Sequence, residues 1–370
     1  MLEILVVLLV VVHFLVPISY YTFVKSFWLR RPWGLNIDEN YLPYITIIVP
    51  TYNEEENISN KLENIYLQDY PKDRVEIIVV DSASRDRTVE KVREWMKARP
   101  DIRVTLIEEP VRRGFIAALN YALQFVPKHT EVVIFTDADS FWERDTLRRV
   151  LKYFADERVG AVTIGVRYMN EKRPAVGNTY RHYFNIIRLG ESKYFGTPVL
   201  NGVLGAFRFK LLKKIGELPQ FTANSNDSTL GSIIAFMGYR SIQVDETEAV
   251  EPMREDEIRR KIRRAQHLIL SFLKTKSYVK ERGLYVKTPF DKVWRMEWYL
   301  TVLNPWLLIA AMLLAMAGVL FNSSLVLFIL LACGFMLLAV KTFRMWIIHQ
   351  LILVIAAVKN LWTKELVWKK

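Results

Sequence analysis

One stretch decides how this chain folds: Val132-Val133-Ile134-Phe135-Thr136-Asp137-Ala138-Asp139. Its four apolar residues predict a strand that is buried on both faces, as in a parallel sheet. Asp137 and Asp139 follow, and they share one side of an extended backbone because side chains alternate with period two. Two carboxylates at the carboxyl end of a parallel strand suit a Mg²⁺ or Mn²⁺ ion that also holds a phosphate group. An acidic turn that caps the following helix is the alternative for such a pair on its own.

Short apolar runs alternate with helical patterns on both sides of this stretch. A charged helical pattern, Thr88–Ala98, separates two of these runs, and Arg113-Gly114 opens another helix. Strands and helices that alternate at this spacing predict βαβ units with right-handed connections. The fold class is therefore α/β, with a Rossmann-like, mainly parallel sheet. The expected strands besides Val132–Phe135 are Ile45–Val49, Glu76–Val80, Val104–Ile107 and Val159–Val166.

Polar residues follow three of the expected strands. Thr51–Glu54 follows the first strand, Asp81 follows the second, and Asp137 and Asp139 follow the fourth. The carboxyl ends of parallel strands form one crevice, so we expect these residues to share a ligand site. The sequence contains neither G-x-G-x-x-G nor G-x-x-x-x-G-K-[ST], which argues against a dinucleotide fingerprint and a P-loop.

Two further segments carry glycine and polar residues. Asn201–Arg208 is spaced by glycines and precedes a helical pattern, and Asn226–Gly231 opens another helix. Asp227 suits the N-cap of that helix, which is the commonest use of aspartate at such a position. A cap does not exclude catalysis, and both interpretations stay open at this point.

The apolar residues gather at the two ends of the chain. Hydrophobic residues make up 51% of the 370, which is high for a soluble protein, and the net charge is +12. Residues 4–24 are long enough to cross a bilayer, and Lys25, Arg30 and Arg31 follow them. The positive-inside rule then places the N-terminus outside the cell membrane and the next domain in the cytoplasm. Because basic residues flank the apolar segments, they favour an anionic membrane surface over nucleic acid as the partner.

The C-terminal part repeats this membrane-associated pattern. Residues 256–298 set apolar residues opposite basic ones at helical spacing, which predicts amphipathic helices in the headgroup plane. Residues 299–340 predict a transmembrane hairpin, and residues 341–370 predict an interfacial or transmembrane helix. The lone Cys333 lies in an apolar segment, so the sequence has no disulfide framework. Before these segments, the expected division is 1–25 for an N-terminal anchor and 42–255 for the soluble domain.

Several short motifs together resemble a known family. They are Pro50-Thr51-Tyr52-Asn53-Glu54, Val80-Asp81-Ser82-Ala83-Ser84, Arg113-Gly114, Asp137-Ala138-Asp139 and Asp227-Ser228-Thr229-Leu230. In this order they are similar to membrane-bound, inverting GT-A glycosyltransferases of family 2, a group that includes cellulose, chitin and hyaluronan synthases. The resemblance covers roughly residues 44–270. It implies a multi-pass membrane protein with a cytoplasmic GT-A domain.

The resemblance also implies a role for the residues of each motif. Asp139 is the main ligand of Mg²⁺ or Mn²⁺, with Asp137 beside it, and the metal bridges the phosphates of a leaving nucleoside diphosphate. Asp227 is the catalytic base that takes the proton of an acceptor hydroxyl. The nucleotide-binding residues are Pro50, Thr51, Tyr52, Glu54, Asp81, Arg113 and Asp137.

The acceptor side departs from the family pattern. Arg263-Arg264-Ala265-Gln266-His267 replaces the Q-x-x-R-W element of the processive synthases, and together with Gly202 it marks the diphosphate and acceptor region. Arginines grip a diphosphate well, but lipid headgroup binding explains Arg263 and Arg264 almost equally. Without the tryptophan we expect the addition of one or a few sugars. Asn226 also stands where the family has an acidic residue, and Ser82 replaces an aspartate.

The resemblance therefore implies a metal-dependent, inverting glycosyltransferase. The donor is a UDP- or GDP-sugar, with UDP favoured, and the acceptor is a hydroxyl of a membrane-associated glycan or a lipid-linked sugar. A polyprenyl (dolichyl) phosphate sugar synthase is the alternative with the same fold. Those enzymes usually carry Leu-Gln-x-Pro-Pro where this chain has Ser140-Phe141-Trp142-Glu143-Arg144. A non-catalytic membrane scaffold with this fold is the second alternative.

Overall fold

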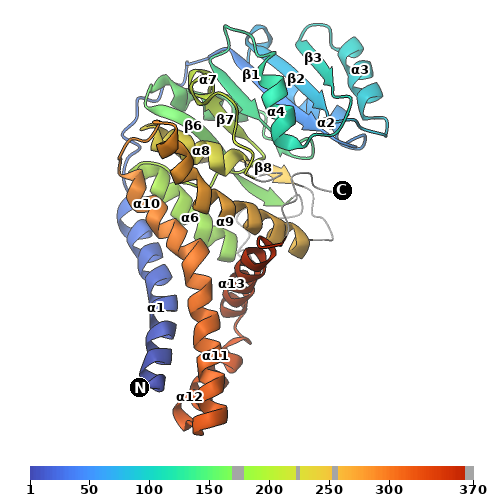
Figure 1. The fold of residues 1–370 in the computed structure, drawn as a ribbon. Coiled ribbons are helices and arrows are strands. Elements are labelled where there is room, and N and C mark those ends of the chain that lie inside the picture. Colours follow the sequence, from blue (N-terminus) through green and yellow to red (C-terminus); the bar gives the residue numbers. More distant parts are fainter. Residues whose placement is uncertain (169–178, 222–225, 252–256, 363–370) are drawn as a thin grey trace.

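The structure is a computed structural model that describes residues 1–168, 179–221, 226–251 and 257–362. A layered α/β domain stands on a stalk of long helices, and further helices lie between the two parts (Figure 1). The chain starts at the far end of the stalk, builds the α/β domain and then returns to the stalk.

An eight-stranded sheet forms the centre of the α/β domain, in the order β3-β2-β1-β4-β7-β6-β8-β5. Its first half is parallel, because β1 pairs with β2 and β4, and β2 pairs with β3. These strands lie where the sequence predicts them: β4 has the predicted bounds, and the other three are each two residues longer. They are β1 (Ile45–Thr51), β2 (Val75–Asp81), β3 (Arg103–Glu108) and β4 (Val132–Phe135).

The second half of the sheet contains an antiparallel strand that the sequence analysis did not predict. β7 (Gly205–Arg208) runs antiparallel to both of its neighbours, β4 and β6 (Val159–Tyr168). β8 (Arg240–Glu251) runs parallel to β6, and the short β5 (Phe141–Trp142) pairs antiparallel with β8. The sheet is thus mainly parallel, as predicted, but mixed, because β7 and β5 both run antiparallel to the strands they pair with.

Side chains of the central strands alternate between two hydrophobic layers. Ile47 and Val49 of β1 face one layer, whereas Ile48 faces the other, and all three are fully buried. Continuous apolar runs in parallel strands require such cover on both faces. Because both faces of the sheet are covered, the carboxyl ends of the parallel strands are where a ligand site can form. The first layer includes α2 (Ile58–Tyr66), α3 (Thr88–Ala98) and α5 (Thr146–Leu151), and the second includes α4 (Phe115–Leu123), α7 (Phe209–Ile215) and α8 (Asn226–Phe236).

Three segments of the described chain are long and apolar enough to cross a membrane: Leu2–Trp28, Phe290–Asn322 and Lys341–Lys359. The hairpin predicted for residues 299–340 is present as two helices, but the second has 13 residues and is shorter than a usual span. Which helices cross the bilayer, and in which direction, stays a prediction. The stalk helices are α1 (Leu2–Phe23), α10 (Phe290–Trp298), α11 (Asn304–Asn322), α12 (Leu325–Leu337) and α13 (Lys341–Lys359).

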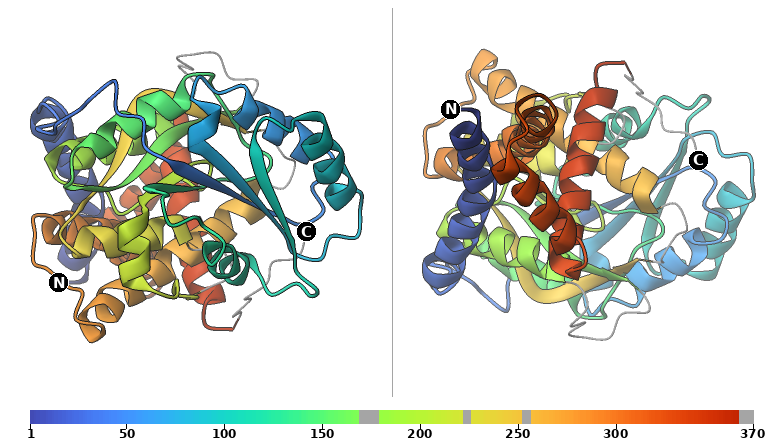
Figure 2. Two further views of the ribbon diagram at one scale, coloured as in Figure 1. Left: turned by 90° about the horizontal axis from the view of Figure 1, so that it is seen from above. Right: turned by 90° about the horizontal axis from the view of Figure 1, so that it is seen from below.

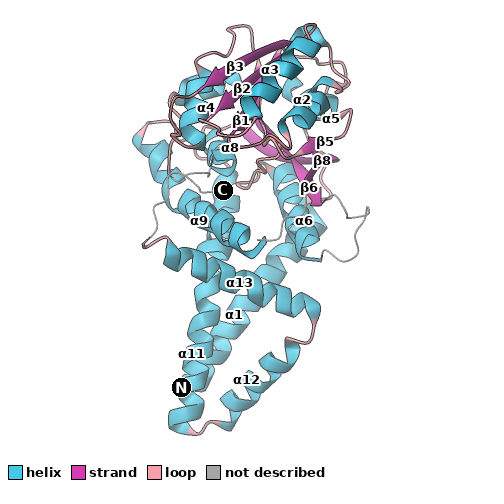
Figure 3. Ribbon diagram, turned by 90° about the vertical axis from the view of Figure 1, so that its right-hand side faces the viewer, coloured by secondary structure: helices cyan, strands magenta, loops and turns pink. Residues whose placement is uncertain are grey.

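Helices α6 (Thr179–Tyr194) and α9 (Glu257–Glu281) lie between the sheet and the stalk. Figure 3 shows α13 lying across the inner end of the stalk, and Figure 2 shows the same arrangement from below. The apolar face of α9 packs on α13, where Ala265 and Ile269 meet Ile352. The predicted amphipathic helix is therefore present, and part of its apolar face is covered by protein. A position in the headgroup plane stays a prediction.

Candidate active site

A cavity of about 530 Å³ lies between the carboxyl ends of β1 and β4 and the helices α6, α9 and α13. Its volume is typical of small-molecule sites. Of the twelve predicted site residues, ten line this cavity. The predicted residues that line it are Pro50, Thr51, Tyr52, Glu54, Asp137, Asp139, Gly202, Asp227, Arg263 and Arg264.

The loop after β1 forms one end of the cavity. The guanidinium carbon of Arg112 lies 3.5 Å from the centre of the Tyr52 ring, which is a stacked cation–π arrangement. Asn53 has a φ of 54°, in the left-handed region that asparagine tolerates better than most residues. Its side-chain oxygen accepts a hydrogen bond from the Arg85 N–H at 2.9 Å. This tight turn presents Thr51 and Tyr52 to the cavity.

Asp81 and Arg113, both predicted to bind the nucleotide, do not line the cavity. Asp81 is buried and accepts hydrogen bonds from the hydroxyl of Thr51 at 3.2 Å and from the N–H of Ser84 at 2.8 Å. Burial raises the pKa of the Asp81 carboxyl. Arg113 forms an ion pair with the buried Glu109 at 2.6 Å. Asp81 therefore supports the cavity wall through Thr51, and direct nucleotide contact by either residue stays a prediction.

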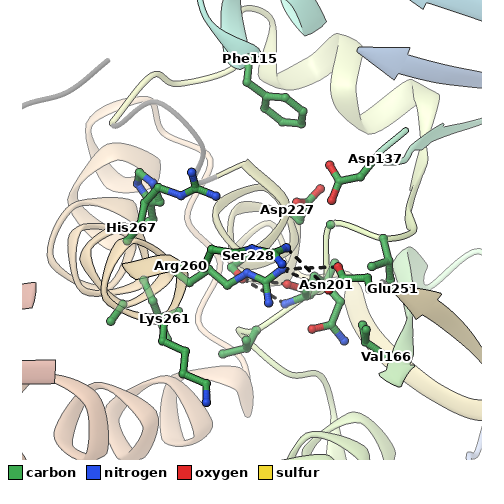
Figure 4. Close-up of a pocket in the computed structure, with 18 of the residues that line it drawn as sticks. Phe115, Asp137, Val166, Asn201, Asp227, Ser228, Glu251, Arg260, Lys261 and His267 are labelled. Atoms are coloured by element: carbon green, nitrogen blue, oxygen red, sulfur yellow. Dashed lines mark hydrogen bonds and ion pairs between the residues drawn. The ribbon is translucent and has the colours of Figure 1, made fainter. Parts of the chain in front are cut away.

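Four carboxylates gather in the middle of the cavity: Asp137, Asp139, Asp227 and Glu251. Burial raises the pKa of Asp137 well above its usual range, and the negative charges of the other three raise it further. Gly202 leaves room for this group, because a Cβ there would lie 2.8 Å from Asp227 Oδ2 and 3.5 Å from Asp137 Oδ2. Figure 4 shows the carboxyl groups of Asp137 and Asp227 side by side. Asp137, which lies just after β4, and Asp227, a residue of α8, thus lie next to each other although they are far apart in the sequence.

Asp227 lies in the first turn of α8, as the sequence predicts. Burial raises the pKa of its carboxyl to about 6. Its Oδ1 atom is buried, and in the described part of the chain it has no hydrogen-bond partner. Buried polar atoms in folded proteins are nearly always paired, and a raised pKa in a cleft is typical of functional carboxylates. Asp227 also lines the cavity, and its other oxygen, Oδ2, lies on the side of Gly202 and Asp137, so Oδ2 is the atom placed to accept a hydrogen bond from a ligand.

Asp137 and Asp139 are the candidate ligands of a divalent cation. Among the described residues, no group of three or more His, Cys, Asp or Glu side chains is arranged to hold a metal ion by itself. A Mg²⁺ or Mn²⁺ site that phosphate oxygens complete needs only one or two carboxylates. Asp137 and Asp139 supply such a pair, and a cation beside them would relieve the repulsion that raises the pKa of Asp137. The donor set therefore fits a cation that binds together with a diphosphate.

A buried lysine supports the turn that carries these two carboxylates. Lys61 of α2 is fully buried, and its Nζ donates a hydrogen bond to the Ser140 carbonyl at 2.7 Å. Nζ also lies 4.0 Å from the centre of the Trp142 ring. Burial lowers the pKa of Lys61 to about 7, although the charges of Asp137 and Asp139 act in the opposite direction. Sequence reasoning missed Lys61 because a lysine on an amphipathic helix is usually exposed.

The basic face of α9 lines the opposite wall. Arg264 donates a hydrogen bond to Glu251 at 3.4 Å, and the guanidinium of Arg260 lies 4.0 Å from the same carboxylate. The charge of Arg264 also acts on Asp137. Of the two interpretations of these arginines, the position beside the carboxylate cluster favours diphosphate binding over headgroup binding. The cations of α9 that line the cavity are Arg260, Lys261, Arg263 and Arg264.

Sequence reasoning also missed cavity residues from α6, the end of β8 and α13. Arg188 of α6 donates a hydrogen bond to Asn201 Oδ1 at 3.2 Å, and both line the cavity. Glu251 is the last residue of β8, and His349 comes from α13. For Glu251 alone, the sequence carries a signal: polar and apolar residues alternate with period two in part of β8, which is typical of a strand. Nothing in the sequence pattern places α6 or α13 beside the strand ends.

Sequence-family comparison finds two overlapping matches. Glycosyl transferase family 2 matches residues 46–216, and Glycosyl transferase family group 2 matches residues 132–343. Among solved structures, the mannosyltransferase PcManGT from Pyrobaculum calidifontis, in complex with GDP-Man and Mn²⁺, is 40% identical in sequence. The match covers 99% of this chain and 100% of that one, with a TM-score of 0.86.

Two curated relatives match over shorter lengths. The probable glycosyltransferase YdaM of Bacillus subtilis is 30% identical over 217 residues, which cover 56% of this chain and 50% of the relative. The beta-monoglucosyldiacylglycerol synthase of a Synechocystis species is 32% identical over 136 residues, covering 36% of this chain and 28% of the relative. The chain thus spans half or less of these relatives. The comparisons confirm the predicted α/β fold of the GT-A type with apolar helices toward both ends.

Proposed function

Because the chain belongs to glycosyltransferase family 2, we propose that it moves a sugar from a nucleoside-diphosphate sugar to a hydroxyl group, with inversion at the anomeric carbon. The acceptor is a membrane-held glycan or a lipid-linked sugar. One observation carries this proposal: the Asp227 carboxylate, whose pKa is raised to about 6, lines the cavity beside Asp137, across the gap left by Gly202. A reacting sugar carbon between them would have the base, Asp227, on one side and the carboxylate proposed to bind the metal, Asp137, on the other.

The donor we propose is a GDP-sugar, with mannose as the first candidate. This choice is supported by the solved mannosyltransferase, which aligns along its whole length with this chain and binds GDP-Man and Mn²⁺. The preference for UDP that the sequence analysis stated gains no support from that neighbour.

In the proposed reaction, Asp139 and Asp137 hold a divalent cation at the donor diphosphate. When bound, the cation supplies positive charge against the negative charge that develops on the leaving group. Arg263 and Arg264 act on the same diphosphate from the opposite wall, as the position of α9 supports. An arginine fork matches phosphate oxygens well and keeps its charge at every relevant pH. Tyr52, stacked with Arg112, closes the nucleotide end.

Asp227 then acts as the base. The acceptor oxygen forms a bond to the anomeric carbon while the bond from that carbon to the phosphate oxygen breaks. The proton of the acceptor hydroxyl passes to Asp227, and the nucleoside diphosphate leaves with the electron pair of the broken bond. A pKa of about 6 leaves most of the Asp227 population charged at neutral pH, yet basic enough to take a proton.

The acceptor class follows from the need for a base. A lipid phosphate is already anionic and attacks without proton removal, so a polyprenyl phosphate sugar synthase has no use for a carboxylate with a raised pKa at this point. The scaffold alternative leaves the whole carboxylate cluster unexplained, because clustered buried charges destabilise a fold that does not use them.

We further propose the topology that charge placement predicts, with the α/β domain in the cytoplasm and the N-terminus outside.

A donor panel tests this proposal. GDP-mannose, GDP-glucose, UDP-glucose and UDP-N-acetylglucosamine are each added to the purified full chain in detergent, with and without Mn²⁺. A ligand that binds only the folded protein raises the melting temperature. We expect GDP-mannose with Mn²⁺ to give the largest rise, and little effect when EDTA is present. A larger rise with either UDP-sugar would contradict the donor assignment, and no rise with any of the four would contradict the proposed function.

A further inference from the structure

The cavity continues from the strand ends to the apolar helices of the stalk. Its far end is lined by Thr301, which follows α10, and by Met345, Ile352 and Leu353 of α13. Both segments belong to helices that are apolar and long enough to enter a membrane. A single space therefore joins the nucleotide end to residues at the level where the stalk begins. An amphiphile can lie in it with a polar end at Asp227 and an apolar end among α13 residues.

Nitrogen-bearing side chains from three helices converge at this far end. They are Arg188 of α6, Lys261 of α9 and His349 of α13, and all three line the cavity. The charges of Lys261 and Arg188 both act on the His349 ring, so the three groups lie close together. The His349 ring also contacts Phe184, with ring centroids 5.5 Å apart. The packing of α13 against α9 and α6 thus builds a site that none of these helices has alone.

The charge of the cavity changes sign along its length. Its centre holds the acidic cluster around Asp137 and Asp227, whereas Lys261 extends away from that cluster in Figure 4. At the far end, Arg188 is held at Asn201 and interacts with the carboxylate of Glu297. The permanent cations Arg188 and Lys261 thus lie at this end together with the imidazole of His349 and with Glu297, which is hydrogen-bonded to the buried Glu191. A partly buried site of this kind selects an anion that brings several acceptor oxygens, such as a phosphate group.

We propose that Arg188, Lys261 and His349 bind the phosphate group of a lipid-phosphate-linked acceptor. Its apolar chain runs along Met345 and Leu353 toward the membrane, and its sugar reaches Asp227. This inference rests on the proposed function and narrows its acceptor: the sugar is attached to the lipid through a phosphate. An uncharged glycolipid, such as a glycosyl diacylglycerol, would leave the cations of this site without a ligand.

The test measures binding of farnesyl phosphate, a short prenyl phosphate, to the full chain in a neutral detergent by calorimetry. GDP and excess Mn²⁺ are present throughout, so that the donor site is filled. We expect Lys261→Gln to weaken binding about tenfold, since a hydrogen bond to a charged phosphate is lost. Lys261→Arg keeps a cation and should bind nearly as well as the wild type. Arg259→Gln is the matched control, because Arg259 is the exposed neighbour on α9 and does not line the cavity.

Arg188→Gln, on a different helix, tests the same site if Lys261→Gln disturbs folding. Unchanged affinity for farnesyl phosphate in both glutamine variants would overturn the inference. So would displacement of farnesyl phosphate by an equal concentration of phosphatidylglycerol, which would identify a general headgroup site, or equal binding of farnesol. GDP-mannose binding is measured on the same samples. If the wild type does not bind GDP-mannose, the proposed function fails; if it binds and only the farnesyl phosphate results disagree, the acceptor inference alone fails.

Discussion

Substituting Gly202 by alanine tests the geometry of the reacting centre without removing any functional group. The new Cβ would lie 2.8 Å from Asp227 Oδ2, and this gap must open by about 0.6 Å to reach the 3.4 Å of an ordinary contact. Its distance to Asp137 Oδ2, 3.5 Å, is already ordinary. The methyl group therefore displaces the proposed base, Asp227, but not Asp137, which is proposed to bind the metal.

The size of the effect follows from this displacement. A misplacement of about 1 Å at a reacting centre costs about a hundredfold in rate. For Gly202→Ala we therefore expect kcat for sugar transfer to fall by about 10- to 100-fold, or about 1.4–2.7 kcal/mol in barrier height. Thermal stabilisation by GDP-mannose and Mn²⁺ should stay as in the wild type. Gly334→Ala is the control, because a Cβ there meets nothing within 4 Å.

The assay follows GDP release and the glycosylated product together. An unchanged kcat in Gly202→Ala would refute the position of Asp227 at the reacting carbon. Loss of donor binding together with loss of transfer would refute the assignment of separate roles to Asp227 and Asp137, because it would show that the methyl group acts on the donor site.

Three further predictions address the ionisable groups of the site. With saturating substrates and Mn²⁺, kcat should rise with pH and level off above about 6, because Asp227 must be charged to accept a proton. A rate that falls across this range would contradict the assignment. Asp139→Ala should abolish Mn²⁺-dependent stabilisation by GDP-mannose, whereas full stabilisation in this variant would place the metal elsewhere. For Lys61, the folded-state pKa of about 7 lies below the usual value, so the unfolded chain binds the extra proton between these two values and stability rises with pH there. Relative to Lys61→Met, the free energy of unfolding of the wild type without metal should therefore increase by about 1.4 kcal/mol per pH unit from pH 7 to 9 in denaturant titrations, and a constant difference would show that Lys61 is not buried as a titrating group.

The parallel half of the sheet could be predicted from local patterns. Each of its strands is an apolar run ended by polar residues, and the buried positions Ile47, Ile48 and Val49 show why such runs are needed. The same rule predicts that Thr51 and the Asp137–Asp139 pair lie at one edge of the sheet, and they line one cavity. The remaining strands and the docking of the helices depend on contacts between residues far apart in the sequence, which hydrophobic periodicity does not reveal.

The antiparallel strand β7 illustrates this limit. Gly205 and Ala206 give little strand signal, yet β7 forms because it pairs along its length with β4 on one side and with β6 on the other. The insertion of β7 also carries Gly202 to the acidic cluster. For the same reason, the contributions of Lys61, Arg188 and His349 could not be predicted, since each depends on how a helix docks rather than on its own sequence.

The proposed function is tested most directly by Asp227→Asn. The substitution keeps the shape of the side chain but removes its ability to take a proton. Transfer of mannose from GDP-mannose to a lipid-linked sugar should fall by about 10²- to 10⁴-fold, while binding of GDP-mannose with Mn²⁺ stays unchanged. Transfer at the wild-type rate would contradict the account, because it would show that the acceptor needs no base and that Asp227 has only a structural role in the first turn of α8.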